Sequence, residues 1–218
     1  MMICWGAHSF LMFGAALIIF GATGQAIAAE ETALPLSAMD TCPLKIGMKV
    51  PQVVLISADG KPFELSDAIS QQPTVLIFYR GGWCPYCNAQ LGQLQKIEPE
   101  FLALGYQLIA VSPDRPEELK KSVAKQQLSY TLISDSKADA AKAFGLAFRV
   151  DDNTFARLKE YNIDLEAAAG EGHHLLPVPA VFLVGKDGII DFSYINPNYR
   201  ERLSPELLLT AAKMYAQE

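Results

Sequence analysis

The feature that most constrains this chain is a pair of cysteines at the junction between a buried strand and a helix. Residues 74–79 form an apolar run without alternation, which is typical of a strand buried on both faces of a parallel sheet. Two glycines follow, and apolar residues then recur at helical spacing, at Leu91, Leu94, Ile97, Phe101 and Leu104. Cys84 and Cys87 lie at the start of that expected helix.

This placement predicts thiol chemistry. A helix N-terminus favours the reactive thiolate through its unpaired N–H groups and the positive end of its dipole. Residues three apart share a helix face with Cβ atoms roughly 5–6 Å apart, so Cys84 and Cys87 can close a reversible disulfide. A structural zinc site would need two more ligands, for which His173 and His174 are the available candidates. No second C-x-x-C follows, so we expect no bound metal.

The remaining pattern predicts one α/β domain from Leu44 to Glu218, with a mixed central β-sheet and helices on both faces. An N-terminal β-hairpin, residues 52–65, precedes the cysteine strand, and Ser66 is expected to cap a short helix. Pro99 is expected to kink or end the helix that begins at the cysteines. Further strands are expected at 106–111, 131–133, 181–184 and 189–195, and helices at 116–127, 137–144 and from Ser204 onward. Residues 147–176 form an insertion of roughly thirty residues.

The first 28 residues read as a signal peptide. The first Asp, Glu, Lys or Arg is Glu30, and an apolar block followed by small residues precedes it, which places cleavage before Ala29 or Glu30. A retained membrane anchor is the alternative, because residues 10–29 approach the roughly 20 apolar residues that span a bilayer. We therefore expect export, to the periplasm of a bacterial envelope, with transient membrane contact through the signal segment. Residues 29–43 would form a flexible lead-in.

Charge and cysteine content narrow the function further. The 218 residues carry a formal charge of −6 and contain no Lys/Arg run that could follow a phosphate backbone, which argues against a nucleic-acid partner. Only Cys42, Cys84 and Cys87 remain after the signal, too few for a disulfide-stapled scaffold.

The segment from Phe78 to Asn88, FYRGGWCPYCN, resembles the active-site turn of the alkyl hydroperoxide reductase/thiol-specific antioxidant group of the thioredoxin superfamily. It is similar in particular to the peroxiredoxin-like bacterial proteins that carry C-x-x-C at this turn. The likeness extends through 148–152, 163–166, 173–174, 177–182 and 196–203. The resemblance implies a thioredoxin-like fold, with the insertion placed before a strand that begins at a cis-proline, Pro179.

The resemblance also implies roles for individual residues. Cys84 and Cys87 would be the redox pair, and Arg202 would steady a thiolate and a peroxide, with a solvated arginine as the alternative. Arg80 is a candidate by its position just before the two glycines: it would donate to a developing oxyanion, or else pair with a carboxylate. Substrate would contact residues of the turn and of the proline loop that faces it: Trp83, Pro85, Tyr86, Val178 and Pro179. Two further interpretations rest on position alone: His173 and His174 either line the cleft or face solvent from a polar loop, and Cys42 is a spare thiol or a resolving one.

Two registers compete at this turn. In typical peroxiredoxins the attacking cysteine follows a Thr or Ser by three residues and a Pro by seven. Aligning that cysteine on Cys87 puts Cys84 at the hydroxyl position and Arg80 at the proline. The thioredoxin register instead makes Cys84 the attacking thiol, exposed at the helix start, and Cys87 the resolving one; we expect the latter.

The sequence thus predicts an antioxidant enzyme without a cofactor that reduces peroxide through Cys84 and Cys87, with an external, thioredoxin-like dithiol as reductant. A thiol-disulfide oxidoreductase acting on protein disulfides of the envelope is the alternative. A metal-binding or copper-delivery module is a third hypothesis, but such modules usually space their cysteines C-x-x-x-C.

Overall fold

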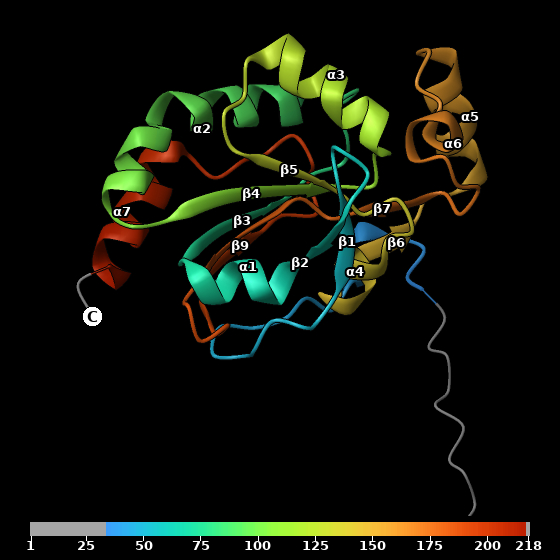
Figure 1. Ribbon diagram of the computed structural model, residues 1–218. Helices are drawn as coiled ribbons and strands as arrows, with labels where there is room; N and C mark the ends of the chain where they lie inside the picture. The colour runs from blue at the N-terminus through green and yellow to red at the C-terminus, as the bar shows by residue number, and fades with distance from the viewer. Residues whose placement is uncertain (1–33, 217–218) are drawn as a thin grey trace, which may run out of the picture. The chain divides into compact units, whose positions relative to one another are not determined.

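The structure is a computed structural model, and it describes residues 34–216. The predicted signal peptide therefore lies outside the described residues. Within the described part, seven strands form a mixed sheet in the order β2-β1-β5-β4-β3-β8-β9 (Figure 1). Its strands are β1 (Val54–Ser57), β2 (Pro62–Glu64), β3 (Thr74–Phe78), β4 (Gln107–Ser112), β5 (Thr131–Ser134), β8 (Ala180–Val184) and β9 (Ile190–Ile195).

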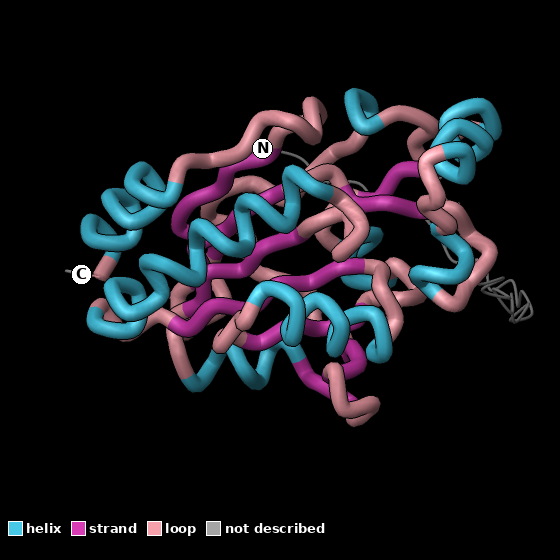
Figure 2. The backbone as a smooth tube through the Cα atoms, turned by 90° about the horizontal axis from the view of Figure 1, so that it is seen from above, coloured by secondary structure: helices cyan, strands magenta, loops and turns pink. Residues whose placement is uncertain are grey.

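The helices cover the sheet from both sides, as Figures 1 and 2 show. They are α1 (Leu65–Gln71), α2 (Pro85–Ala103), α3 (Pro116–Gln126), α4 (Asp139–Ala143), α5 (Asp152–Glu160), α6 (Leu165–Ala169) and α7 (Pro205–Tyr215), with a 3-10 turn at Ala38–Asp40. Helices α2, α3 and α7 pack on one face of the sheet, while α1 and α4 pack on the other. The predicted α/β architecture is confirmed.

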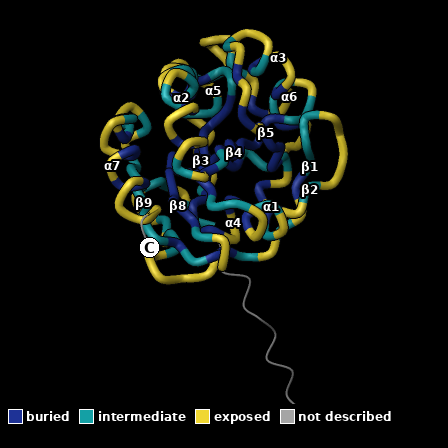
Figure 3. The backbone as a smooth tube through the Cα atoms, turned by 60° about the vertical axis from the view of Figure 1, so that its left-hand side comes forward, coloured by how far each residue is buried: buried dark blue, intermediate teal, exposed yellow. Residues whose placement is uncertain are grey.

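Strand β3 shows why the sheet has two cores. Val75, Ile77 and Tyr79 point into the cluster under α2, α3 and α7. Leu76 and Phe78 point into the cluster under α1 and α4. Side chains of a strand alternate between faces, so a continuous apolar run is required when both faces are covered. The central strands are accordingly the most buried part of the molecule (Figure 3).

Local predictions at the hairpin and at α2 met different outcomes. The N-terminal hairpin is confirmed, since β1 pairs antiparallel with β2, and β1 also joins the main sheet by pairing antiparallel with β5. Ser66 was wrong as a helix cap: α1 begins at Leu65 and its N-cap is Glu64. Pro99 does not end α2, which runs on to Ala103.

The proline loop differs from the prediction. The described residues contain no cis peptide bond, so the bond before Pro179 is trans and the expected cis-proline was wrong. The loop reaches its position by backbone pairing: the Val178 N–H donates to the Leu146 carbonyl at 2.9 Å, and the Asn196 N–H donates to the Pro179 carbonyl at 3.3 Å.

The insertion has secondary structure of its own. Strands β6 (Ala147–Arg149) and β7 (Leu175–Pro177) pair antiparallel, and helices α5 and α6 lie between them. Asp151 caps α5 by accepting from the Thr154 N–H at 2.9 Å, and Asp164 caps α6 by accepting from the Ala167 N–H at 3.0 Å. These caps fix the starts of two short helices.

The described part of the predicted lead-in packs on the domain. The Arg149 N–H donates to the Pro35 carbonyl at 2.8 Å, and the Leu44 N–H donates to the Phe144 carbonyl at 3.0 Å. Gly145, with φ of +68°, lies against the Cys42 carbonyl, where a Cβ would collide. No helix among residues 34–216 is long and apolar enough to cross a membrane.

Candidate active site

The cysteine pair lies at the start of α2, just after the turn that follows β3. Gly81 has φ of +147° and a Cβ there would collide with the Trp83 ring, so this tight turn requires glycine. Cys84 is the N-cap of α2, and Pro85 occupies the first helical turn, where its missing N–H costs nothing. The predicted position of the pair at the helix start is confirmed.

Both cysteines are free thiols, and both are buried, with 1% of Cys84 and 0% of Cys87 exposed. The expectation that Cys84 would face solvent was wrong, because Cys84 is part of the apolar cluster under α2, α3 and α7, against which Trp83 also packs. Both thiols therefore lie in a largely desolvated environment, where neighbouring charges act strongly.

The two thiols differ in acidity. The pKa of Cys84 is lowered from 9.0 to about 6, first by a hydrogen bond from the Cys87 thiol and then by the Cys87 backbone and the charges of Arg80 and Arg202. Burial and the neighbouring Cys84 raise the pKa of Cys87 well above its ordinary value. Cys84 is therefore the thiolate of the pair at neutral pH.

Arg202 joins the site from the loop before α7. Its Nη2 donates to the Cys87 sulfur at 3.3 Å, although the two residues are 115 positions apart in the sequence. This contact is the geometry that the resemblance implied for Arg202. Arg202 contacts Cys87, as the peroxiredoxin register implies, whereas the lowered pKa favours Cys84 as the attacking thiol. The charge of Arg202 lowers the pKa of both thiols, while the hydrogen bond between the thiols lowers only that of Cys84.

Arg80, just after the end of β3, is the second arginine beside the pair. It is 8% exposed, and its guanidinium sits 5.0 Å from the centroid of the Trp83 ring and 4.2 Å from that of Tyr199. Its Nε is buried without a hydrogen-bond partner in the described structure. The aromatic rings hold this cation through their negative faces, close enough to Cys84 for its charge to lower the pKa of that thiol.

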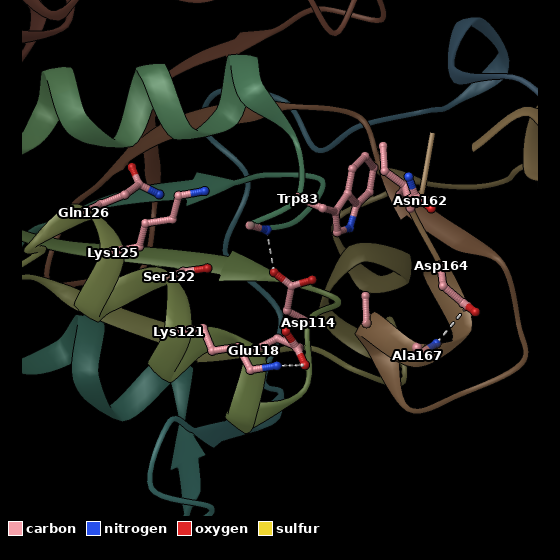
Figure 4. A pocket seen from close by; sticks show the side chains of 13 residues that line it. Trp83, Asp114, Glu118, Lys121, Ser122, Lys125, Gln126, Asn162, Asp164 and Ala167 are labelled. Atoms are coloured by element: carbon pink, nitrogen blue, oxygen red, sulfur yellow. Dashed lines mark hydrogen bonds and ion pairs between the residues drawn. The ribbon is translucent and has the colours of Figure 1, made fainter. Parts of the chain in front are cut away.

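A buried carboxylate, Asp114, holds the turn from the β4–α3 loop. Its Oδ2 accepts from the Gly82 N–H at 2.6 Å, as Figure 4 shows beside Trp83. Burial raises the pKa of Asp114 to about 6. Asn88 closes the turn from α2 by donating to the Gly82 carbonyl at 2.8 Å. The pocket of 420 Å³ in Figure 4 lies against Gly82 and Asp114 and is lined mainly by α3, the α5–α6 connection and α6.

The predicted substrate-contact residues separate into two groups. Trp83 is partly buried beside Arg80, and Tyr86 is 40% exposed and meets the Tyr199 ring edge to face at 5.8 Å. Pro179 lines a second pocket beside Arg80. Val178 is fully buried in the core under α1 and α4, so its side chain is unavailable to a substrate.

The histidines have structural partners. His173 accepts from the Leu175 N–H at 2.8 Å and its Nε2 lies 2.7 Å from the Ser136 carbonyl, so both ring nitrogens are occupied. His174 stacks on Phe155 at 3.9 Å and its Nε2 lies 2.7 Å from Glu166. No cluster of three or more potential metal ligands occurs among residues 34–216, so the structure does not bring the histidines to the cysteines as a metal site. Cys42 is exposed, on the segment against Gly145.

Two residues in contact with the site escaped prediction. Asp114 follows an apolar strand like any loop aspartate, and nothing in the sequence places it 2.6 Å from Gly82. Tyr199 lies in a polar stretch 119 residues from Arg80. Both reach the site through tertiary packing, for which a single sequence carries no signal.

The sequence model of the AhpC/TSA family matches residues 46–193, about two thirds of the chain. The chain belongs to the AhpC/TSA family. Among curated relatives of this AhpC/TSA protein, "Putative peroxiredoxin bcp" of Haemophilus influenzae is 31% identical over 104 residues, which are 48% of this chain and 66% of the relative. "Peroxiredoxin Bcp" of Escherichia coli matches with the same figures. The match thus spans just under two thirds of those relatives. "Thiol-disulfide oxidoreductase ResA" of Bacillus cereus is 23% identical over 146 residues, 66% of each chain.

Solved structures show the same fold for this AhpC/TSA protein. Reduced Prx3 of Vibrio vulnificus, in complex with hydrogen peroxide, superposes with a TM-score of 0.64 at 17% identity, over 78% of this chain and 99% of that one. A PrxQ mutant of Xylella fastidiosa gives 0.62 at 21% identity, over 80% and 99%. The predicted thioredoxin-like, peroxiredoxin-type fold is confirmed.

Proposed function

We propose that this protein is a thiol-dependent peroxidase whose attacking sulfur is Cys84. The observation that carries the proposal is the pair of thiols at the start of α2, with Arg202 in contact with one and Arg80 beside the other. Membership of the AhpC/TSA family and the likeness to the Bcp peroxiredoxins support it.

The steps follow from this geometry. The Cys84 thiolate attacks one peroxide oxygen, so an S–O bond forms, the O–O bond breaks, and the departing oxygen takes a proton and leaves as water or an alcohol. Arg80 and Arg202 offer positive charge to the departing oxygen. The Cys87 thiol then attacks the Cys84 sulfenic acid, which forms the disulfide and releases water. An external dithiol of the thioredoxin type reduces the disulfide and is itself oxidised.

Exchange with protein disulfides is the alternative activity. It is favoured because Cys84 occupies the position at which typical peroxiredoxins carry the Thr or Ser hydroxyl that orients a peroxide. The weaker likeness to ResA also favours it. Attack by Cys84 on a substrate disulfide, followed by release through Cys87, would use the same pair.

The two activities separate in a paired assay of the reduced protein. We expect rapid loss of hydrogen peroxide in a single turnover and slow reduction of insulin disulfides. Cys87→Ser should accumulate a sulfenic acid at Cys84, detectable by dimedone labelling, and Cys84→Ser should leave peroxide unconsumed. Insulin reduction without peroxide consumption would establish the alternative, and an active Cys84→Ser with an inactive Cys87→Ser would assign the attack to Cys87.

We also propose that the protein acts outside the cytoplasm, in the periplasm, on the strength of the apolar block and small residues before Glu30. The mature chain should then begin at Ala29 or Glu30. Intact-mass measurement on protein from the envelope fraction tests this, and a mass that includes Met1 would mean a retained anchor.

A further inference from the structure

A pocket of 370 Å³ lies beside Arg80, and the peroxidase reaction proposed above gives this pocket no role. Arg80 forms one wall, Arg149 of β6 and Arg157 of α5 contribute two more cations, and Asp151 is the carboxylate present. The formal charge of the lining is therefore +2. The Asp151 carboxylate is engaged with the Thr154 N–H at the start of α5, which lowers its pKa and keeps it ionised.

The three arginines lack the partners that arginines usually have. Among residues 34–216 no carboxylate lies within ion-pair distance of Arg80, Arg149 or Arg157. Arg80 is more than nine-tenths buried and its Nε has no hydrogen-bond partner there. Burying a guanidinium costs free energy unless an anion or several acceptors compensate it, and the rings of Trp83 and Tyr199 supply only part of that compensation.

Apart from the hydroxyl-bearing side chains of Ser37, Thr154 and Tyr199, the rest of the lining is apolar. Phe148 and Val150 flank Arg149, while Pro177, Pro179 and Pro197 come from the sheet side and Leu36 from the N-terminal segment. A volume of this size accommodates several carbon atoms beside a charged group. The pocket therefore fits a molecule that is aliphatic along its length and anionic at one point.

We propose that this pocket binds the carboxylate of an organic hydroperoxide and so selects acidic hydroperoxides over neutral ones. The proposal rests on the proposed peroxidase function and specifies the substrate class of the same site. Arg80 contacts both the pocket and the surroundings of Cys84, so a carboxylate held there keeps the peroxide group of the same molecule near the reacting sulfur. The carboxylate takes no part in bond breaking; the O–O bond is cleaved by Cys84 as described above.

The test separates binding from turnover. Octanoate, which cannot react, is titrated into the reduced full chain by calorimetry, and the double variant Arg149→Gln/Arg157→Gln is compared with Lys213→Gln. Both targeted arginines are exposed, so the fold should survive, and Lys213 lies on α7 at the far end of the sheet (Figure 1). We expect the double variant to weaken octanoate binding at least tenfold and Lys213→Gln to leave it unchanged.

Turnover is then measured with linoleic acid hydroperoxide and its methyl ester, an acid and a neutral molecule with the same chain. The wild type should favour the acid in kcat/KM at least tenfold, the double variant should lose that preference, and both should reduce hydrogen peroxide at equal rates. Octanoate that does not bind, or binds the double variant equally well, overturns the pocket even if hydrogen peroxide is reduced. Octanoate binding without reduction of any peroxide overturns the peroxidase function and, with it, this substrate.

Discussion

At the scale of single residues, the site makes two chemically identical thiols unequal. The hydrogen bond from Cys87 and the charges of two arginines lower the pKa of Cys84. Burial is the largest effect on Cys87, and it raises the pKa of that thiol. The asymmetry is useful because an attacking thiol must be ionised, whereas a resolving thiol must not compete with it. If Cys87 were the attacking thiol instead, the charged sulfur would lie deeper in the core.

This asymmetry predicts a pH profile for alkylation of Cys84. The pKa of about 6 means that its rate with iodoacetamide should be constant above pH 7 and fall as the pH drops through about 6, to about a tenth at pH 5. Cys87→Ala removes the largest cause of the lowered pKa, so the midpoint should move to higher pH. Peptide-resolved mass spectrometry measures both rates. An unchanged midpoint in Cys87→Ala would show that the arginines alone set the acidity.

At the scale of elements, the sequence predicted the strand-to-helix junction because it depends on neighbours in the chain. The apolar run of β3, the glycines and the spacing after Cys84 are all local signals. The proline loop was predicted by resemblance, and its trans Pro179 and buried Val178 show that a similar sequence does not fix a loop conformation. Contacts between loops, such as that of Asp114 with Gly82, have no local signal at all.

That contact yields a prediction for stability. The raised pKa of Asp114 means that the protonated form is favoured on folding, so its contribution is present below pH 4 and is lost as the pH rises through about 6. Asp114→Asn keeps an acceptor for the Gly82 N–H but cannot ionise. Relative to the wild type, its free energy of unfolding should therefore increase between pH 4 and pH 8, by about 3 kcal/mol for a shift of about two pKa units.

Urea unfolding at the two pH values measures this difference, with the exposed Asp40→Asn as the matched control. Asp40→Asn should show no such gain, because its carboxylate remains in water. Equal gains for both variants would mean that net charge, rather than the buried carboxylate, controls the pH dependence. Asp114→Ala should instead destabilise by about 1–3 kcal/mol at pH 4, since it leaves the Gly82 N–H without its acceptor. This loss should disappear by pH 8, because alanine, like asparagine, removes the buried group that ionises in the wild type.

At the scale of the whole molecule, the sheet separates the apolar cluster that contains the cysteines from a second apolar cluster on its other face. The cysteines share the cluster under α2, α3 and α7, where Leu91 lies four residues after Cys87 on the same helix face. The cluster beneath the sheet holds Phe78, Phe144 and Phe182, whose rings meet with centroids 4.8 to 6.2 Å apart. Substitutions that create cavities in the second cluster should therefore lower the free energy of unfolding without altering the pKa of Cys84.

Phe182→Ala and Leu91→Ala test this separation. Each removes a fully buried side chain, so we expect losses of about 3–5 kcal/mol for the first and 2–5 kcal/mol for the second in urea unfolding. At temperatures where both variants are folded, Phe182→Ala should retain the wild-type midpoint of Cys84 alkylation. Leu91→Ala should shift this midpoint, because the cavity lets the Cys87 side chain move away from the position in which its thiol donates to Cys84. A shifted midpoint in Phe182→Ala would show that β3 transmits packing changes from one face of the sheet to the other.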